Sequence, residues 1–193
     1  MCSPIIPSGG RGNKELIIII NNDDIRRYPY KKMAQKYKNI SVYRMPEKAS
    51  LGRCMNFGVS RAKYPYIAKF DDDDFYAASY LRESIGLLRR KKVDVVGKKA
   101  HYVWLSGHQV LILRFPKKEY RYVGKLPGAT LVFKKSVFER VRFPHINVGE
   151  DDRFCSVCRA NGYKVYSGDR FHFAALRRKH SKTIRGLFRR SRF

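Results

Sequence analysis

The stretch YIAKFDDDD, residues 66–74, runs from an apolar segment directly into four consecutive aspartates. The rest of the chain is strongly basic, because the whole sequence holds 42 Lys and Arg residues against 16 Asp and Glu residues. A quarter of the acids therefore lie in this one tetrapeptide. The apolar start of the stretch predicts a buried strand over 66–70, and the acids begin where that strand ends. Four adjacent carboxylates are costly to hold together unless a cation lies between them.

Strand-like and helix-like segments alternate around this stretch. Ser50 is a candidate N-cap for one of the helices. The alternation predicts an α/β fold, a single domain whose mostly parallel central sheet is flanked by helices. Strands are predicted over 15–20, 40–45 and 66–70, and helices over 28–38, 50–63 and 78–92.

The second half of the chain continues with more strands and two further helices. The last predicted helix ends at Asn161-Gly162, which is a typical C-cap. Strands are predicted over 93–97, 101–105, 109–115, 128–133 and 164–167, and helices over 135–141 and 150–160.

The composition is that of an ordinary globular domain. A chain of 193 residues with 44% hydrophobic residues is long enough to bury one core. The longest aliphatic run, residues 16–20, is far too short to span a membrane, and the N-terminus lacks the apolar middle of a signal peptide. We therefore expect a cytoplasmic protein with a flexible leader over 1–14, a domain over 15–180 and a basic tail over 181–193.

The formal net charge of +26 predicts a polyanionic partner. Nucleic acid, an anionic membrane or envelope surface, and a phosphate-bearing substrate all satisfy this expectation. The basic tail is a candidate for holding the protein at the inner face of an anionic membrane, although a solvated tail is the plainer alternative.

Two polar segments follow the ends of predicted strands. Asn21 and Asn22 follow the first strand, and the aspartates 71–74 follow the third. Ligands of parallel sheets bind at the carboxyl ends of the strands, so these segments are expected to meet in one crevice. A carboxylate cluster there suits Mg²⁺ or Mn²⁺ carrying phosphate oxygens. The alternative is a solvated acidic turn.

A second acidic group, Glu150-Asp151-Asp152, begins the predicted helix over 150–160. Acids in a first helical turn are stabilising in themselves, so capping is one interpretation. The functional interpretation makes one carboxylate a general base that accepts a proton from a hydroxyl.

Two further features are more ambiguous. The pair Cys155 and Cys158 has the spacing of a zinc or redox site, but it lies inside a helix without a matching second pair, so core packing by reduced thiols is favoured. His172 lies between two phenylalanines, where burial in the core is as good an interpretation as ligation.

Six segments, taken in order, resemble the family 2 glycosyltransferases with the GT-A fold, which is Rossmann-like. The resemblance runs from about Glu15 to His180. The segments are IIIINNDD, SLGRCMNFG, YIAKFDDDD, KLPGATLVFKK, GEDDRFC and LRRKHSKT.

The resemblance implies a nucleotide-diphosphate sugar donor and metal-assisted transfer with inversion to a hydroxyl acceptor. On this basis Asp73, with Asp71, holds Mn²⁺ or Mg²⁺, and Asp72 contacts the ribose or sugar. Asp151 matches the general base, supported by Glu150.

The remaining expected site residues also come from the resemblance. Asn21, Asn22, Arg53 and Arg177 are expected at the donor. His180 matches the family's late histidine, which joins the metal or diphosphate site, with His172 as its substitute.

The chain departs from the family pattern in two respects. The family opens with a strand and a helix before the segment equivalent to 15–20, and it commonly has two Asp where this chain has Asn21 and Asn22. Asn keeps a donor and an acceptor but loses the negative charge. A second subunit covering the exposed sheet edge, giving a homodimer, is one hypothesis.

The sequence thus predicts an inverting glycosyltransferase of surface-polysaccharide or cell-envelope glycan synthesis, acting on an unidentified glycan or polymer acceptor. Two alternatives share its acids and basic surface. One is a metal-dependent nucleotidyltransferase or nuclease, and the other is a non-catalytic basic module that binds nucleic acid or the envelope. Nucleic acid is not expected as the partner under the leading interpretation.

Overall fold

The structure is a computed structural model that describes residues 13–37 and 39–178. The predicted tail, His180 and nearly all of the predicted leader lie outside the described residues. The α-helices are α1 (Arg27–Ala34), α2 (Leu51–Arg61), α3 (Tyr80–Lys91) and α4 (Glu150–Ala160), and the 3-10 helices are η1 (Gly128–Thr130) and η2 (Lys135–Glu139). The strands are β1 (Leu16–Ile20), β2 (Ile40–Arg44), β3 (Tyr66–Ala68), β4 (Phe75–Tyr76), β5 (Val95–Gly97), β6 (His101–Leu105), β7 (Val110–Arg114), β8 (Arg121–Tyr122), β9 (Val132–Lys134), β10 (Val165–Ser167) and β11 (Phe173–Arg177).

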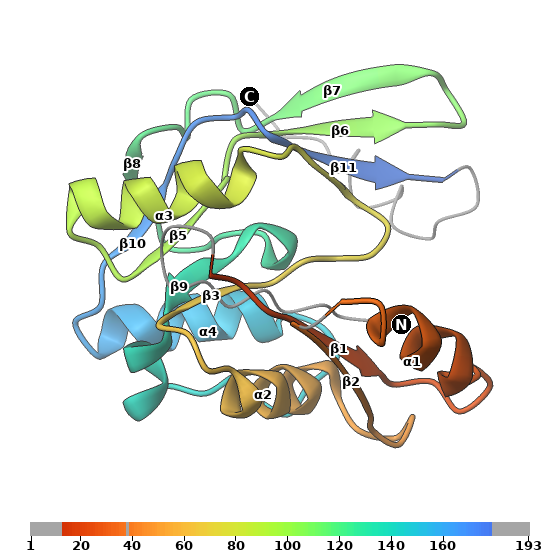
Figure 1. Cartoon of the computed structure of the whole chain (residues 1–193). Coiled ribbons are helices and arrows are strands. Elements are labelled where there is room, and N and C mark those ends of the chain that lie inside the picture. The colour runs from red at the N-terminus through yellow and green to blue at the C-terminus, as the bar shows by residue number, and fades with distance from the viewer. Residues whose placement is uncertain (1–12, 38, 179–193) are drawn as a thin grey trace.

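The strands form three sheets rather than one mostly parallel sheet. The central sheet has the order β3-β9-β5-β10-β8, a second sheet has the order β4-β11-β6-β7, and β1 pairs with β2 (Figure 1). In the central sheet β5 and β10 are parallel, but β9 runs antiparallel between β3 and β5, and β8 runs antiparallel to β10. The prediction of a mostly parallel sheet was therefore wrong. Only the short 3-10 helix η1 leads into β9, not the α-helical crossover that joins neighbouring parallel strands.

The central sheet is buried between two layers. Successive residues along a strand point to opposite faces, so Ile67 and Phe133 join the core with α2 and α4, while Ala68 and Val132 join the core with α3. Figure 1 shows α3 on one side of the sheet and α2 and α4 on the other. These two layers fix the carboxyl end of β3 and the start of α4 relative to each other.

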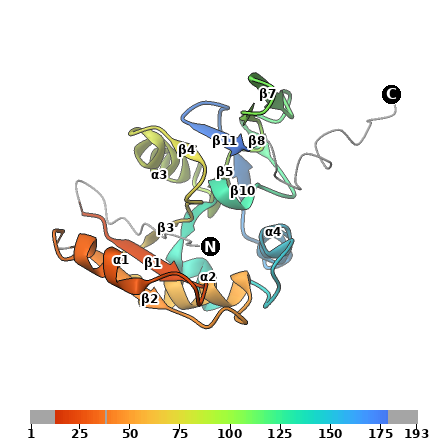
Figure 2. The ribbon, with the colours of Figure 1, turned by 90° about the vertical axis from the view of Figure 1, so that its right-hand side faces the viewer.

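The β1–β2 pair is attached to this core by side chains. Ile17 and Ile19 are buried in the same cluster as Ile67 and Phe133, with α2 packed between them and solvent. Among the described residues no strand pairs β1 with the central sheet. Figure 2 shows β1, β2 and α1 together at one side of the molecule. The prediction that a second subunit covers the edge of β1 stays untested.

Helix α2 is fastened to the loop that leads to α4. Ser50 caps the helix as predicted, accepting a hydrogen bond from the Arg53 N–H at 3.4 Å. A Cβ atom at Gly52 would lie 1.8 Å from the Pro144 carbonyl oxygen, so only glycine allows this approach. Asn56 exchanges two hydrogen bonds with the backbone of Phe143, at 2.8 and 2.9 Å. The glycine and asparagine of the SLGRCMNFG segment therefore have structural roles.

Several predicted element boundaries need correction. The expected strand over 128–133 begins as η1, because Thr130 turns back to bond the Pro127 carbonyl, and β9 starts only at Val132. The expected helix over 28–38 is the shorter α1, which has no side-chain N-cap. The strands β4, β8 and β11 were not predicted. The helix over 150–160 and its end at Asn161 are confirmed, with Gly162 at a positive φ of 80°.

Candidate active site

The aspartate loop at the end of β3 is tied to the segment 127–130. The Asp71 carboxylate accepts a hydrogen bond from the buried Lys69 ammonium. The Asp71 N–H donates to the Tyr76 hydroxyl at 3.0 Å, and that hydroxyl donates to the Ala129 carbonyl at 2.7 Å. One tyrosine side chain thus joins the loop to η1.

The four aspartates differ in their surroundings. The Asp74 side chain is only 1% exposed, and its Oδ1 accepts hydrogen bonds from the Leu176 N–H at 2.9 Å and from Arg177 Nη1 at 3.1 Å. Burial raises the pKa of Asp74, and the Leu176 hydrogen bond and the Arg177 charge oppose this. Asp74 therefore anchors β11, whereas Asp72 and Asp73 are exposed to solvent.

The second acidic group also contacts η1. Asp151, in the first turn of α4, accepts a hydrogen bond at Oδ2 from the Gly128 N–H at 2.7 Å and at Oδ1 from the Asp152 N–H at 2.8 Å. A Cβ atom at residue 128 would lie 3.0 Å from Asp151 Oδ2, so glycine makes room for this carboxylate. The side chain of Asp151 is held in one orientation with lone pairs left for another donor.

The charges of both acidic groups act on Glu150. It is 6% exposed, and burial raises its pKa. The negative charges of Asp151 and Asp71 raise this pKa further, while the positive charge of Lys69 lowers it. The aspartate loop and the start of α4 are therefore close enough to interact, and both hold the segment 127–130.

The side chains of the two predicted asparagines form hydrogen bonds with backbone groups. Asn21 Nδ2 donates to the Pro46 carbonyl at 2.6 Å, and Asn22 Oδ1 accepts hydrogen bonds from the N–H groups of Asp24 and Ile25 at 2.8 and 3.1 Å. This is the local turn that Asn commonly forms. No hydrogen bond or ion pair that we observe in residues 13–37 and 39–178 joins these side chains to the aspartate loop.

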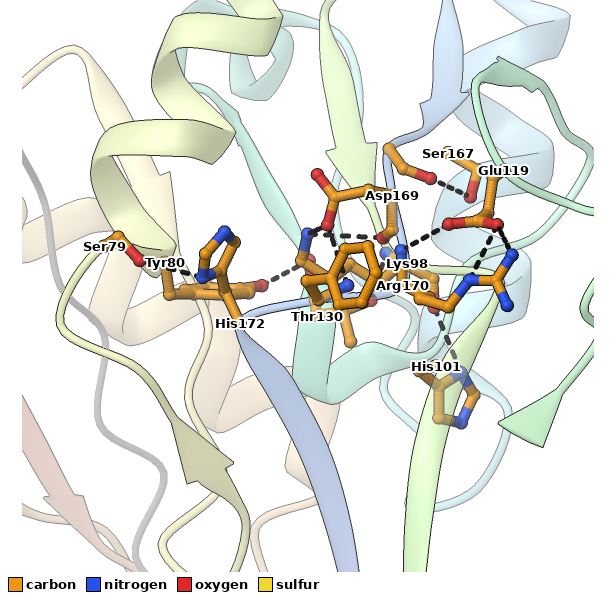
Figure 3. Close-up of polar contacts among 12 residues, drawn as sticks. Ser79, Tyr80, Lys98, His101, Glu119, Thr130, Ser167, Asp169, Arg170 and His172 are labelled. Atoms are coloured by element: carbon orange, nitrogen blue, oxygen red, sulfur yellow. Dashed lines mark hydrogen bonds and ion pairs between the residues drawn. The ribbon is translucent and has the colours of Figure 1, made fainter. Parts of the chain in front are cut away.

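The other predicted donor and metal residues are spread over the fold. The Arg53 side chain is exposed on α2, and Arg177 is engaged by Asp74. His172 points toward Ser79, with Nδ1 2.8 Å from the serine hydroxyl (Figure 3). Its φ of 68° is unusual for a residue other than glycine. His180, the first choice for the metal, lies outside the described residues.

Sequence reasoning missed a buried network that holds η1 (Figure 3). Thr130 Oγ1 accepts a hydrogen bond from the Lys98 N–H at 3.0 Å and donates to the Pro127 carbonyl at 2.9 Å, and Tyr80 donates to the Thr130 carbonyl at 2.9 Å. Lys69 was also missed. The one available signal was a lysine in the otherwise apolar 66–70 strand, because a buried cation needs an acidic partner.

Replacing Thr130 by valine is expected to lower the free energy of unfolding by about 2 kcal/mol. The valine keeps the shape but leaves the buried Lys98 N–H without its partner, and it removes one of the two hydrogen bonds that Thr130 donates to the Pro127 carbonyl. Urea unfolding measures the loss. Thr130→Ser, which keeps the hydroxyl, is the control and should lose clearly less. A Thr130→Val variant that is no less stable than Thr130→Ser would show that the hydroxyl does not carry the effect.

A preformed metal cage is absent from the described residues, which contain no group of three or more His, Cys, Asp or Glu side chains able to hold an ion. Asp71 already neutralises Lys69, but Asp73 and Asp72 offer exposed carboxylate oxygens. Mg²⁺ usually binds through one or two carboxylates together with substrate phosphates. The residues therefore fit a divalent cation that arrives with a diphosphate.

The cysteine pair belongs to the core, as the sequence favoured. Cys155 and Cys158 are free thiols with no measurable exposure, packed beside Phe154. Burial raises the pKa of each thiol to about 12, so both stay protonated. Within the described part of the chain, no helix is long and apolar enough to cross a membrane.

Comparison with known proteins identifies the class of protein. The sequence matches the family described as Glycosyl transferase family 2 over residues 10–184. The chain belongs to this family, whose members are inverting glycosyltransferases.

Individual relatives agree with this assignment. The chain is 26% identical over 137 residues to the Escherichia coli O-antigen biosynthesis glycosyltransferase WbnJ, covering 66% of this chain and 53% of WbnJ. A structure of S. aureus TarS 1-349 in complex with UDP-GlcNAc has a TM-score of 0.65 at 14% identity, covering 86% of this chain and 50% of that one. Another TarS 1-349 structure has a TM-score of 0.62 at 14% identity, covering 84% and 51%. The TarS likeness shows the GT-A fold. The chain spans about half the length of these relatives.

Proposed function

We propose that the protein transfers a sugar with inversion from a nucleotide-diphosphate sugar to a hydroxyl acceptor, in surface-polysaccharide or cell-envelope glycan synthesis. The observation that carries the proposal is the meeting of two acidic groups at η1. The Tyr76 hydroxyl connects Asp71 to the Ala129 carbonyl, and Asp151 accepts from the adjacent Gly128 N–H. The part of WbnJ in O-antigen biosynthesis supports the polysaccharide context, and the UDP-GlcNAc bound to TarS supports the donor class.

Asp151 is the proposed base. Both of its oxygens accept backbone hydrogen bonds, so the carboxylate is oriented before the acceptor arrives. It then takes the proton of the acceptor hydroxyl as the sugar is transferred. Glu150, the preceding residue, is the proposed support for this base; it is buried, and burial raises its pKa.

The aspartate loop is proposed to bind the sugar donor and its cation. Asp73, with Asp71, would hold Mn²⁺ or Mg²⁺, and Asp72 would contact the ribose or sugar. When bound, the cation supplies positive charge beside the departing diphosphate. Arg53, Arg177, Asn21, Asn22 and His180 remain proposed donor contacts, with His172 as the substitute for His180. A cytoplasmic location at the inner membrane face stays a prediction.

UDP-GlcNAc with Mn²⁺ is expected to raise the melting temperature by about 5–10 °C at 100 times its Kd, because ligand binding then contributes about 2.7 kcal/mol. Differential scanning fluorimetry measures the shift, with GDP- and dTDP-sugars tested in parallel. Asp73→Asn should remove it. Glu139→Gln, an exposed acid on η2, is the matched control and should keep it.

Two outcomes would contradict the proposal. One is the absence of a shift with every nucleotide sugar. The other is stabilisation by a polynucleotide alone with a steep salt dependence, which would favour the nuclease, nucleotidyltransferase or nucleic-acid-binding alternatives.

A further inference from the structure

A group of basic side chains lies beside the first turn of α4. Lys99 follows β5, Arg114 ends β7, and Lys125 precedes η1. The β6–β7 hairpin that carries Arg114 extends outward from the body of the molecule (Figure 1). These residues come from three separate parts of the chain, so their grouping is a product of the fold.

Phe115 is the centre of this group. Lys99 Nζ lies 4.7 Å and Arg114 Cζ 4.9 Å from the centroid of its ring. The ring is 41% exposed, and the residue has a φ of 50°, in the left-handed region. A bulky residue there is strained, and such strain is found most often where a side chain must be presented. The ring thus brings two cations together at the surface.

The two cations have no acidic partner in the described part of the chain. Every ion pair that we observe in residues 13–37 and 39–178 involves other basic residues. Lys99 and Arg114 are nevertheless both partly buried. Burial lowers the pKa of Lys99, and the charges of Lys125 and Arg114 lower it further, against the charge of Asp152. Burial and the charge of Arg177 lower the pKa of Arg114. A bound anion would relieve this repulsion.

The group adjoins the proposed base. Lys125 Nζ forms an ion pair at 2.9 Å with Asp152, the residue after Asp151. Lys125 also precedes by three residues the glycine that holds Asp151. Lys99 is close enough to Lys125 and Asp152 to feel their charges, so an anion bound at Lys99 and Arg114 would lie near the first turn of α4, which also carries Asp151.

We propose that Lys99, Arg114 and Phe115 form an acceptor subsite for a sugar unit bearing a carboxylate or phosphate. This inference rests on the proposed function and adds the chemical class of its acceptor. The arginine offers a planar fork to either anion, the lysine adds a second charge, and the ring offers an apolar surface to the sugar.

Isothermal titration of the full chain at fixed ionic strength tests the subsite with three tetramers. Tetragalacturonic acid carries carboxylates, a glycerol-phosphate tetramer carries phosphates, and maltotetraose is neutral. At least one anionic tetramer is expected to bind 10-fold or more tightly than maltotetraose, and the stronger of the two identifies the anion.

The variant Lys99→Gln/Arg114→Gln should weaken that binding at least 10-fold. The control Lys31→Gln/Lys32→Gln removes the same charge from exposed residues of α1 and should change it less than 2-fold. The UDP-GlcNAc shift should persist in both variants. If the first variant does not fold, Arg114→Lys, which keeps the charge but loses the fork, replaces it.

Equal loss in the control variant would attribute binding to net charge and overturn the subsite, as would equal binding of maltotetraose. Loss of the UDP-GlcNAc shift in Lys99→Gln/Arg114→Gln would move these cations to the donor side, overturning the subsite while the proposed function stands. Selective anion binding without any nucleotide-sugar shift in the unaltered chain would instead remove the proposed function and the acceptor role with it.

Discussion

Asp151→Asn is expected to lower kcat by about 100- to 10,000-fold, the usual contribution of a general base. Asparagine keeps one oxygen, which can accept the Gly128 N–H, but its amide nitrogen cannot accept the Asp152 N–H, so the variant loses the basic oxygen and one of the two local hydrogen bonds. Donor binding should be unchanged, because the exposed aspartates of the 71–74 loop are untouched. Release of UDP from UDP-GlcNAc measures turnover, with water standing in for the acceptor, and the melting-temperature shift measures donor binding.

Asp152→Asn is the matched control for this prediction. Its carboxylate is one residue away, but it pairs with Lys125 and faces partly into solvent, so turnover should fall only a few-fold. A donor shift that disappears in Asp151→Asn would show that this residue binds the donor. A collapse of turnover in Asp152→Asn alone would move the role of base to that residue.

Lys98→Met is expected to lower the free energy of unfolding by about 3 kcal/mol. Lys98 Nζ donates to Asp169 Oδ1 at 2.8 Å, and the two side chains are 5% and 21% exposed (Figure 3). Removing one partner of a buried pair leaves the other charge without compensation, which costs about 3–5 kcal/mol. The lower end applies here because Asp169 keeps some contact with water. Urea unfolding at pH 7 gives the value.

The pH dependence of this loss supplies a check. Burial acts to raise the pKa of Asp169, but the hydrogen bond and charge of Lys98 lower it below its ordinary value. The pair therefore stabilises the fold above the unfolded pKa of about 3.9, and its contribution is lost as pH falls through the lower folded pKa. In Lys98→Met the unpaired carboxylate is protonated more easily, so the gap between the two proteins should narrow at pH 4. Lys98→Met/Asp169→Asn should recover most of the loss, and a gap that is unchanged by pH would contradict this account.

Local signals in the sequence predicted the elements whose ends carry clear capping residues. Helix α4 was placed at its observed bounds because acids fill its first turn and Asn161-Gly162 follows its last. Pairing between strands was not predictable in the same way. The place of β9 between β3 and β5 depends on pairing between residues 36 to 68 positions apart, which no local pattern encodes. Similarly, β11 depends on hydrogen bonds from Leu176 to the distant Asp74.

The sequence predicted which residue types form the candidate site, but not how their side chains are oriented. The sequence marked four aspartates without separating Asp74, which faces inward, from Asp72 and Asp73, which face solvent. That separation depends on β11, which supplies the Leu176 N–H and the Arg177 guanidinium that bind Asp74. The asparagines after β1 were expected in the same crevice; Asn22 closes a local turn, Asn21 donates to the Pro46 carbonyl, and their role at the donor stays a prediction.

The separate β1–β2 ladder has a consequence for motion. Among the described residues it shares side-chain packing, but no strand pairing, with the central sheet. Opening this pair would break the packing of Ile17 and Ile19 in the shared core but no ladder hydrogen bond of the central sheet. The loop holding Asn21 and Asn22 belongs to that pair. Its position relative to Asp151 therefore depends on side-chain packing and not on strand pairing with the central sheet.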